Sequence, residues 1–137
     1  MNKDKNKSFL AFSFSQGFIP PNIPIATFKQ GNKELNFILD SGSDRNVIDK
    51  NILSEIQHEQ VGIGDVHTLT GVNGTVKVDK CKVTFQHGED KYTAEFLVTD
   101  LKEAVDAIKT AHSIQLHGML GSLFFKENKI VMDFERM

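Results

Sequence analysis

The chain has 137 residues, of which 39% are hydrophobic and 25% charged, and its formal net charge is −2 at pH 7. This length suits a single domain, and the composition is that of an ordinary soluble globular protein. Without a basic excess or a basic cluster, the charge argues against nucleic acid or a membrane surface as the main partner. The single cysteine, Cys81, excludes an intramolecular disulfide and argues against a metal site built on thiolates.

The N-terminal segment contains three lysines in its first seven residues and then an apolar run at 9–14. The run is short, is interrupted by Ser13, and is followed by no small-residue cleavage site, so it is not typical of a signal peptide. Its alternation of apolar and small residues predicts a strand at 9–15. No segment is long enough to span a membrane, and we expect a soluble chain, cytoplasmic if the sequence is full length.

Two further strands are predicted at 23–29 and 34–40, joined by a turn at 30–33. The second strand runs directly into the sequence Phe-Ile-Leu-Asp-Ser-Gly-Ser at 37–43. An apolar strand that ends on a carboxylate, before a turn that glycine makes easy, places this carboxylate at the rim of a core. Its proton affinity can be tuned there, which indicates an active-site loop. Taken alone, an ordinary Asp-Ser-Gly turn is the alternative.

A hairpin is predicted farther along the chain, after a short helical piece at 49–56. Two β-rich runs, at 66–70 and 75–78, are joined by Gly71, Val72, Asn73 and Gly74. Asn-Gly between such runs is a strong hairpin signal, and the glycines favour a mobile tip that approaches a peptide closely. On its own, the segment is more typical of an ordinary surface hairpin.

Strands are then predicted at 78–86 and 91–98, followed by a helix from Asp100 to His112. Asp100 and Glu103 suit the start of this helix, and apolar residues recur at helical spacing along it. Cys81 is expected to be half-buried in the first of these strands. The five histidines show no spacing typical of metal ligands, so no zinc site is predicted.

A second motif lies near the C-terminus, where His-Gly-Met-Leu-Gly-Ser-Leu-Phe-Phe occupies 117–125. The polar residues Lys-Glu-Asn-Lys at 126–129 and the run Ile-Val-Met-Asp-Phe at 130–134 follow this motif. Alone, this segment would be interpreted as a buried strand.

Together, the two motifs resemble the signatures of the retroviral-like (retropepsin-type) aspartic proteases, in their cellular or bacterial branch. Asp40, Ser41, Gly42 and Ser43 match the Asp-Thr/Ser-Gly-Ala/Ser signature position by position, with Ser41 in place of the commoner Thr. Met119, Leu120 and Gly121 match the hydrophobic-hydrophobic-Gly strand that passes beside the catalytic loop in this family. The hairpin between the motifs corresponds to the flap, and the resemblance covers about residues 20–134.

The resemblance implies a mainly β, single-lobe, closed β-barrel with one or two short helices. This barrel would form one domain over residues 1–137, with its core at about 20–134. The resemblance also implies that a short apolar turn, a polar hairpin at 126–129 and a strand at 130–134 ending in Asp-Phe follow Gly121. The helix near 100–112 would be an insertion packed outside the barrel. Glycine would be required at 121 because backbone packs against backbone there.

The same resemblance implies an aspartic endopeptidase that needs no metal or cofactor. One chain supplies one catalytic loop, so two Asp40 carboxylates would meet on the two-fold axis of a homodimer and activate a water. Ser41 would form a hydrogen bond across the axis, and Ser43 would pack beneath the loop. The expected substrate-binding residues are Gly42, Asp44, Gly71, Val72, Asn73 and Gly74. An exposed ion pair with Arg45 is the alternative for Asp44.

A peptide or protein is the expected partner, and four apolar side chains are expected to line its cleft: Val47, Ile48, Val72 and Leu123. The alternative function is a non-catalytic module of the same fold that holds a peptide in its cleft or at a sheet edge. Asp40 distinguishes the two, because a binding module has no need of an ionisable group at this position.

Overall fold

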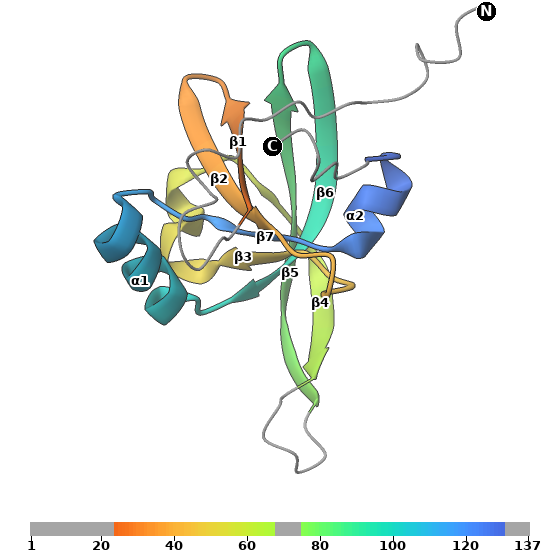
Figure 1. The fold of residues 1–137 in the computed structure, drawn as a ribbon. Helices are drawn as coiled ribbons and strands as arrows, with labels where there is room; N and C mark the ends of the chain where they lie inside the picture. Colours follow the sequence, from red (N-terminus) through yellow and green to blue (C-terminus); the bar gives the residue numbers. More distant parts are fainter. Residues whose placement is uncertain (1–23, 68–74, 131–137) are drawn as a thin grey trace, which may run out of the picture.

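The computed structural model describes residues 24–67 and 75–130 (Figure 1). In chain order the elements are β1 (Ile25–Gln30), β2 (Lys33–Leu39), β3 (Val47–Asp49), η2 (Lys50–Glu55), β4 (Glu59–His67), β5 (Thr75–His87), β6 (Asp90–Thr99), α1 (Lys102–His112), β7 (Gly118–Leu120) and α2 (Ser122–Glu127). The strand predicted at 9–15, the hairpin tip at 71–74 and nearly all of the strand predicted at 130–134 lie outside the described residues.

Six strands form a closed mixed barrel. The sheet order is β1-β2-β7-β3-β6-β5-β4, and a pairing of Lys29 with Gln86 joins β1 to β5. The pairs β2–β7 and β3–β6 are parallel, and the other pairs are antiparallel. β4 remains outside the ring and pairs only with β5, so these two strands form a long hairpin that projects from the barrel (Figure 1).

The barrel interior is filled by aromatic side chains. Five phenylalanines are at most 1% exposed: Phe28, Phe37, Phe85, Phe96 and Phe124. The ring of Phe85 lies at their centre, with its centroid 4.8 Å from that of Phe28 and 5.3 Å from that of Phe37. Along β2, buried residues alternate with half-buried ones, as expected for a strand with one face on the core.

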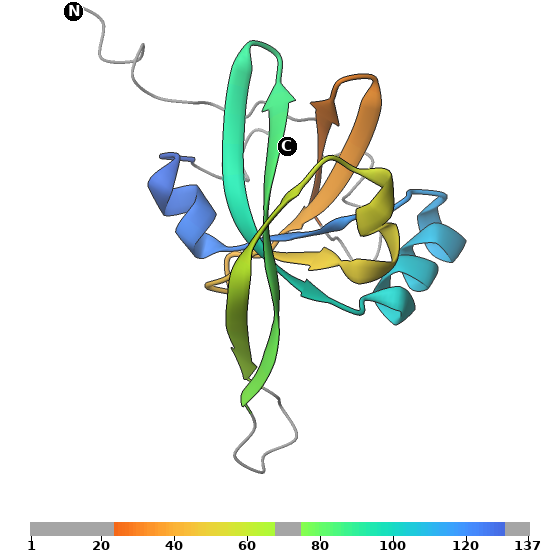
Figure 2. The same ribbon diagram turned by 180° about the vertical axis from the view of Figure 1, so that it is seen from behind.

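Helix α1 packs outside the barrel, as the sequence predicts. Its buried residues Val105 and Ile108 form a second apolar cluster with Ile25 and Leu116. The two helices α1 and α2 lie on opposite sides of the barrel in both views (Figure 1, Figure 2). Neither these nor any other helix in the described part of the chain is long and apolar enough to cross a bilayer.

The start of α1 differs from the prediction. Residue 101 is the N-cap, and its side chain makes no capping hydrogen bond. Asp100 instead accepts a hydrogen bond from the Lys102 N–H at 3.0 Å, which closes the turn just before the helix. The predicted capping pair with Glu103 is therefore wrong, because Asp100 lies one residue too early.

Other local predictions also need correction. The runs predicted at 75–78 and 78–86 are one continuous strand, β5, so the hairpin and the barrel share it. The apolar turn predicted after Gly121 is helix α2, which buries Phe124 and Phe125 and contains no residue that breaks a helix. Cys81 is fully rather than half-buried, and this burial raises the pKa of its thiol to about 11.

A buried histidine just ahead of β7 joins β2 to β3. His117 is 7% exposed, and its Nδ1 accepts the Asn36 N–H at 3.0 Å. Its main chain bonds to Asn36 of β2 and to Asp49 of β3, at 2.8 and 2.9 Å. Desolvation by burial lowers the pKa of His117 below its ordinary value of 6.5, against a smaller opposing effect of the Glu55 charge.

The truncation Phe85→Ala should lower the free energy of unfolding by about 3–5 kcal/mol, because it removes the ring that contacts most of the aromatic core. Phe85→Leu, which keeps most of the volume, should cost less than about 1.5 kcal/mol. Urea unfolding measures both. Equal costs for the two variants would contradict a tightly packed core centred on this ring.

A second prediction concerns pH and His117. The unfolded chain binds a proton at this residue more tightly than the folded protein does, because burial lowers the folded pKa. The contribution of the neutral His117 ring to the free energy of unfolding is complete above the pKa that this residue has in the unfolded chain. It is lost as pH falls through the lower pKa of the folded protein. His117→Gln should therefore flatten the decline of the unfolding free energy from neutral to mildly acidic pH, as measured by urea unfolding at several pH values. A wild-type slope in His117→Gln would refute this role.

Candidate active site

Asp40 follows directly after β2 and is half-buried. Its N–H donates to the Leu120 carbonyl at 2.9 Å, and its carbonyl accepts the Ser43 N–H at 3.2 Å. The carboxylate oxygen Oδ1 accepts the Gly42 N–H at 3.0 Å. No group among the described residues donates to the second carboxylate oxygen, Oδ2. The loop thus fixes the carboxylate through one oxygen and leaves the other available.

The rest of the motif divides into outward-facing and inward-facing residues. Ser41 and Gly42 are exposed, whereas Ser43 is half-buried. The Ser43 hydroxyl donates to the Arg45 carbonyl at 3.0 Å and lies 3.4 Å from the Arg45 nitrogen, which donates to it. Ser43 therefore folds the loop onto itself while Ser41 and Gly42 face outward.

The second motif passes alongside this loop in backbone contact. β7 pairs in parallel with β2, and after it the Ser122 N–H donates to the Ser43 carbonyl at 2.6 Å. A Cβ on Gly121 would lie 2.6 Å from the Arg45 carbonyl oxygen and 2.7 Å from that of Ser43. Only glycine fits between the second motif and the loop.

Asn46 is a site residue that sequence reasoning missed. Its side-chain oxygen accepts the Gly121 N–H at 2.8 Å, and its side-chain nitrogen donates to the Glu95 carbonyl at 3.0 Å. Its own carbonyl accepts the Leu97 N–H at 2.9 Å. One amide side chain therefore ties the end of the loop to both the second motif and β6. A polar residue just before an apolar strand is the only local signal, because both partners lie far along the chain.

An apolar wall adjoins the loop. Ile38, Met119 and Val47 are half-buried and lie side by side across β2, β7 and β3. Because side chains alternate along a strand, Asp40 follows on the same side of β2 as Ile38. The same alternation turns Ile48 into the core, where it is 0% exposed. The expectation that Ile48 lines the cleft is therefore wrong.

A small cavity of about 190 Å³ lies next to the loop, between Asp44, Arg45 and Leu123. Leu123 is 48% exposed on helix α2. Asp44 and Arg45 are exposed and do not pair with each other, since the ion pairs of the described residues are Lys80–Glu95 and Lys102–Asp106. The alternative of an Asp44–Arg45 salt bridge is therefore not realised.

The predicted flap residues Gly71, Val72, Asn73 and Gly74 lie outside the described residues. The strands that carry them are described, and β4 pairs with β5 as far as His67 with Thr75. Within the described ranges, no group of three or more histidine, cysteine or acidic side chains is placed to hold a metal ion.

The closed six-strand barrel, with this loop and second motif at its rim, is the retropepsin-like single-lobe fold. A solved structure of this kind, EIAV protease in complex with the inhibitor HBY-793, superimposes with a TM-score of 0.55. The similarity spans 91% of this chain and 100% of that chain at 16% sequence identity, so it establishes the fold alone. Neither a family model nor a curated protein sequence matches the chain.

Gly121→Ala should lower the free energy of unfolding by about 1–3 kcal/mol or more, because its Cβ would strike backbone oxygens that cannot move aside freely. Gly42→Ala is the matched control, since its Cβ would meet only the Asp40 carboxylate oxygen, at 3.3 Å. Denaturant unfolding compares the two variants. If Gly42→Ala cost as much as Gly121→Ala, the close backbone contact would not be the cause.

Proposed function

We propose that this protein is an aspartic endopeptidase whose active site forms from two Asp40 carboxylates, one from each subunit of a homodimer. The observation that carries the proposal is the placement of Asp40. The main chain of the second motif holds this residue at the rim of a retropepsin-like barrel, beside an apolar wall, with one carboxylate oxygen unoccupied by the described residues.

Two copies are needed because the reaction requires both a base and an acid. The sequence contains one Asp-Ser-Gly motif, so a single chain provides one carboxyl group for this chemistry. A two-fold axis next to the loop would bring Asp40 against Asp40 of the partner subunit. Two carboxylates this close share one proton, as in aspartic proteases generally, and they titrate as a pair.

In the proposed reaction, the ionised Asp40 accepts a proton from water while the water oxygen attacks the carbonyl carbon of the scissile peptide bond. Protonated Asp40 of the partner subunit donates a hydrogen bond to the oxygen that becomes negatively charged. The C–N bond then breaks as a proton passes to the leaving nitrogen. The Gly42 N–H would keep Oδ1 oriented throughout, which leaves Oδ2 for the water.

The loop and its surroundings would bind the substrate as an extended peptide. Ser41 faces outward and would form a hydrogen bond across the dimer axis. Gly42 and Asp44 would contact the peptide main chain, and the apolar wall would accept an aliphatic or aromatic side chain. The projecting β4–β5 hairpin would close residues 71–74 over the substrate.

Asp40→Asn should remove peptidase activity, with a loss of about 10²-fold to 10⁴-fold, because an amide cannot accept the proton of the attacking water. The fold should be retained, since the asparagine oxygen can still accept the Gly42 N–H. Digestion of a diverse peptide library from mildly acidic to neutral pH, read by mass spectrometry, measures the effect. Asp106→Asn, on the exposed face of α1, is the control and should cleave like the wild type.

Equal cleavage by Asp40→Asn and the wild type would refute the proposal. A dimeric wild type that cleaves nothing in the library would favour a non-catalytic peptide-binding module of the same fold. Circular dichroism and sedimentation of both variants would show that any loss of cleavage comes from chemistry and not from unfolding or dissociation.

A further inference from the structure

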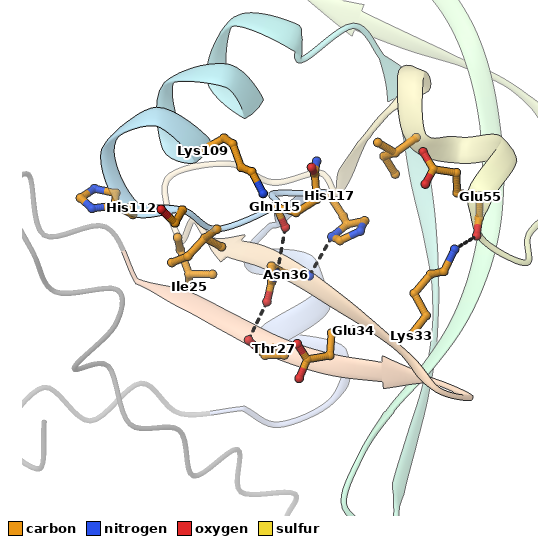
Figure 3. Close-up of a pocket in the computed structure, with 13 residues that line it drawn as sticks. Ile25, Thr27, Lys33, Glu34, Asn36, Glu55, Lys109, His112, Gln115 and His117 are labelled. Atoms are coloured by element: carbon orange, nitrogen blue, oxygen red, sulfur yellow. Dashed lines mark hydrogen bonds between the residues drawn. The ribbon is translucent and has the colours of Figure 1, made fainter.

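A second pocket lies away from the active-site loop. It has a volume of about 930 Å³ and is enclosed by β1, β2, η2, the end of α1 and the segment between α1 and β7 (Figure 3). No residue of the loop at 40–45 lines it. This volume is at the upper end of the range for small-ligand sites.

The floor of the pocket is a chain of hydrogen bonds. The Thr27 hydroxyl donates to the side-chain oxygen of Asn36 at 2.6 Å, and the Asn36 side-chain nitrogen donates to the Gln115 carbonyl at 2.8 Å. Because His117 accepts the Asn36 N–H at Nδ1, its neutral ring carries the proton on Nε2. Asn36 is thus fixed on three sides, and the floor is rigid before any ligand binds (Figure 3).

The walls carry unpaired charges of opposite sign. Lys109 of α1 faces Glu55 of η2 across the pocket, and Glu34 of β2 lies below (Figure 3). Lys33 donates its ammonium hydrogen to the main-chain carbonyl of Glu55. None of these four side chains belongs to an ion pair with another described residue. The η2 and β2 side therefore has one negative charge in excess, and the α1 side has one positive charge.

This distribution of charge selects the class of ligand. A polyanion or a polycation would meet repulsion from one wall, whereas a ligand with an ammonium at one end and a carboxylate at the other matches both walls. Three isoleucines also line the pocket, namely Ile25, Ile52 and Ile114, and they suit aliphatic side chains.

We propose that this pocket binds a short peptide with free termini, with its carboxylate against Lys109, its ammonium against Glu55 and its aliphatic side chains against the isoleucines. The His117 N–H would donate to a peptide carbonyl at the floor. The choice of a peptide among zwitterions rests on the proposed function, since endopeptidase products carry free termini. Because Ile52 and Glu55 belong to η2, which leads into β4, an occupant would link α1 to the base of the projecting hairpin.

The test is a titration of the full-length Asp40→Asn protein, followed by amide chemical shifts in NMR. The probe is the tripeptide Leu-Ala-Leu with free termini, and its N-acetylated, C-amidated form is the comparison. The free peptide should shift the amides of Asn36, Ile52 and Gln115. The capped peptide should bind about a hundredfold more weakly, because it loses two charge-assisted contacts of about tenfold each. Lys109→Gln and Glu55→Gln should each remove one of these contacts and weaken binding of the free peptide about tenfold.

Lys102→Gln is the matched control, because Lys102 lies on the same helix but pairs with Asp106 outside the pocket. Lys102→Gln in the Asp40→Asn protein should bind the free peptide as tightly as the Asp40→Asn protein alone, which is the parent protein here. Equal affinity for free and capped peptides, or full affinity in Lys109→Gln, would overturn the proposal. Shifts confined to the loop at 40–45 would also overturn it, since they would place the peptide at the active site. Because the parent protein lacks the Asp40 carboxylate, these outcomes do not depend on whether the protein is a peptidase.

Discussion

The backbone contact between the second motif and the active-site loop is the constraint on which the rest of the site depends. Main-chain hydrogen bonds join Asp40 to Leu120 and Ser122 to Ser43, and the intervening Gly121 leaves no room for a side chain. Since the main chain makes these bonds, the Asp40 side chain accepts only the Gly42 N–H from the described residues, and its Oδ2 is left for the proposed chemistry. The Asn46 side chain adds a hydrogen bond of its own, which its oxygen accepts from the Gly121 N–H.

The barrel supports this contact because each strand near the loop serves two surfaces. One set of alternating residues, such as Leu39 and Leu120, faces the aromatic core and fixes the position of the strands. The other set, such as Ile38 and Met119, forms the wall beside Asp40. A substitution in the core would therefore act on the site through strand position, whereas one in the wall would act on the proposed contact with a substrate. Helix α1 and the second pocket rest on a second apolar cluster, and Ile38 of the wall also packs against this cluster.

Much of the fold was predictable from the sequence because its signals are local. The β1–β2 hairpin, the strand that runs into Asp40 and the helix up to His112 follow from turn residues and hydrophobic periodicity. The long hairpin follows similarly from β-rich runs on either side of a glycine-containing turn, but its register, in which His67 pairs with Thr75, does not. The need for glycine at 121 was predicted from the resemblance to retropepsins, not from periodicity.

The remaining features depend on contacts between distant segments or on runs too short to interpret. β3 has three residues, so periodicity alone could not decide whether Val47 or Ile48 faces the core. Helix α2 comes from an apolar run of a length equally compatible with a turn. Closure of the barrel by Lys29 and Gln86, the bonds of Asn46 and the charge pattern of the second pocket join segments far apart in the chain. No local pattern encodes such pairings.

The most direct test of a shared two-carboxylate site is a subunit-mixing experiment. Wild-type and Asp40→Asn chains would be unfolded together, refolded at different ratios and assayed for peptide cleavage at constant total protein. If each site needs both Asp40 carboxylates, only wild-type homodimers are active, and an equal mixture retains about a quarter of the wild-type activity. Retention of about half, with activity proportional to the wild-type fraction, would mean that each chain acts independently, and retention of about three quarters would mean that one Asp40 per dimer suffices. Either result would contradict the account.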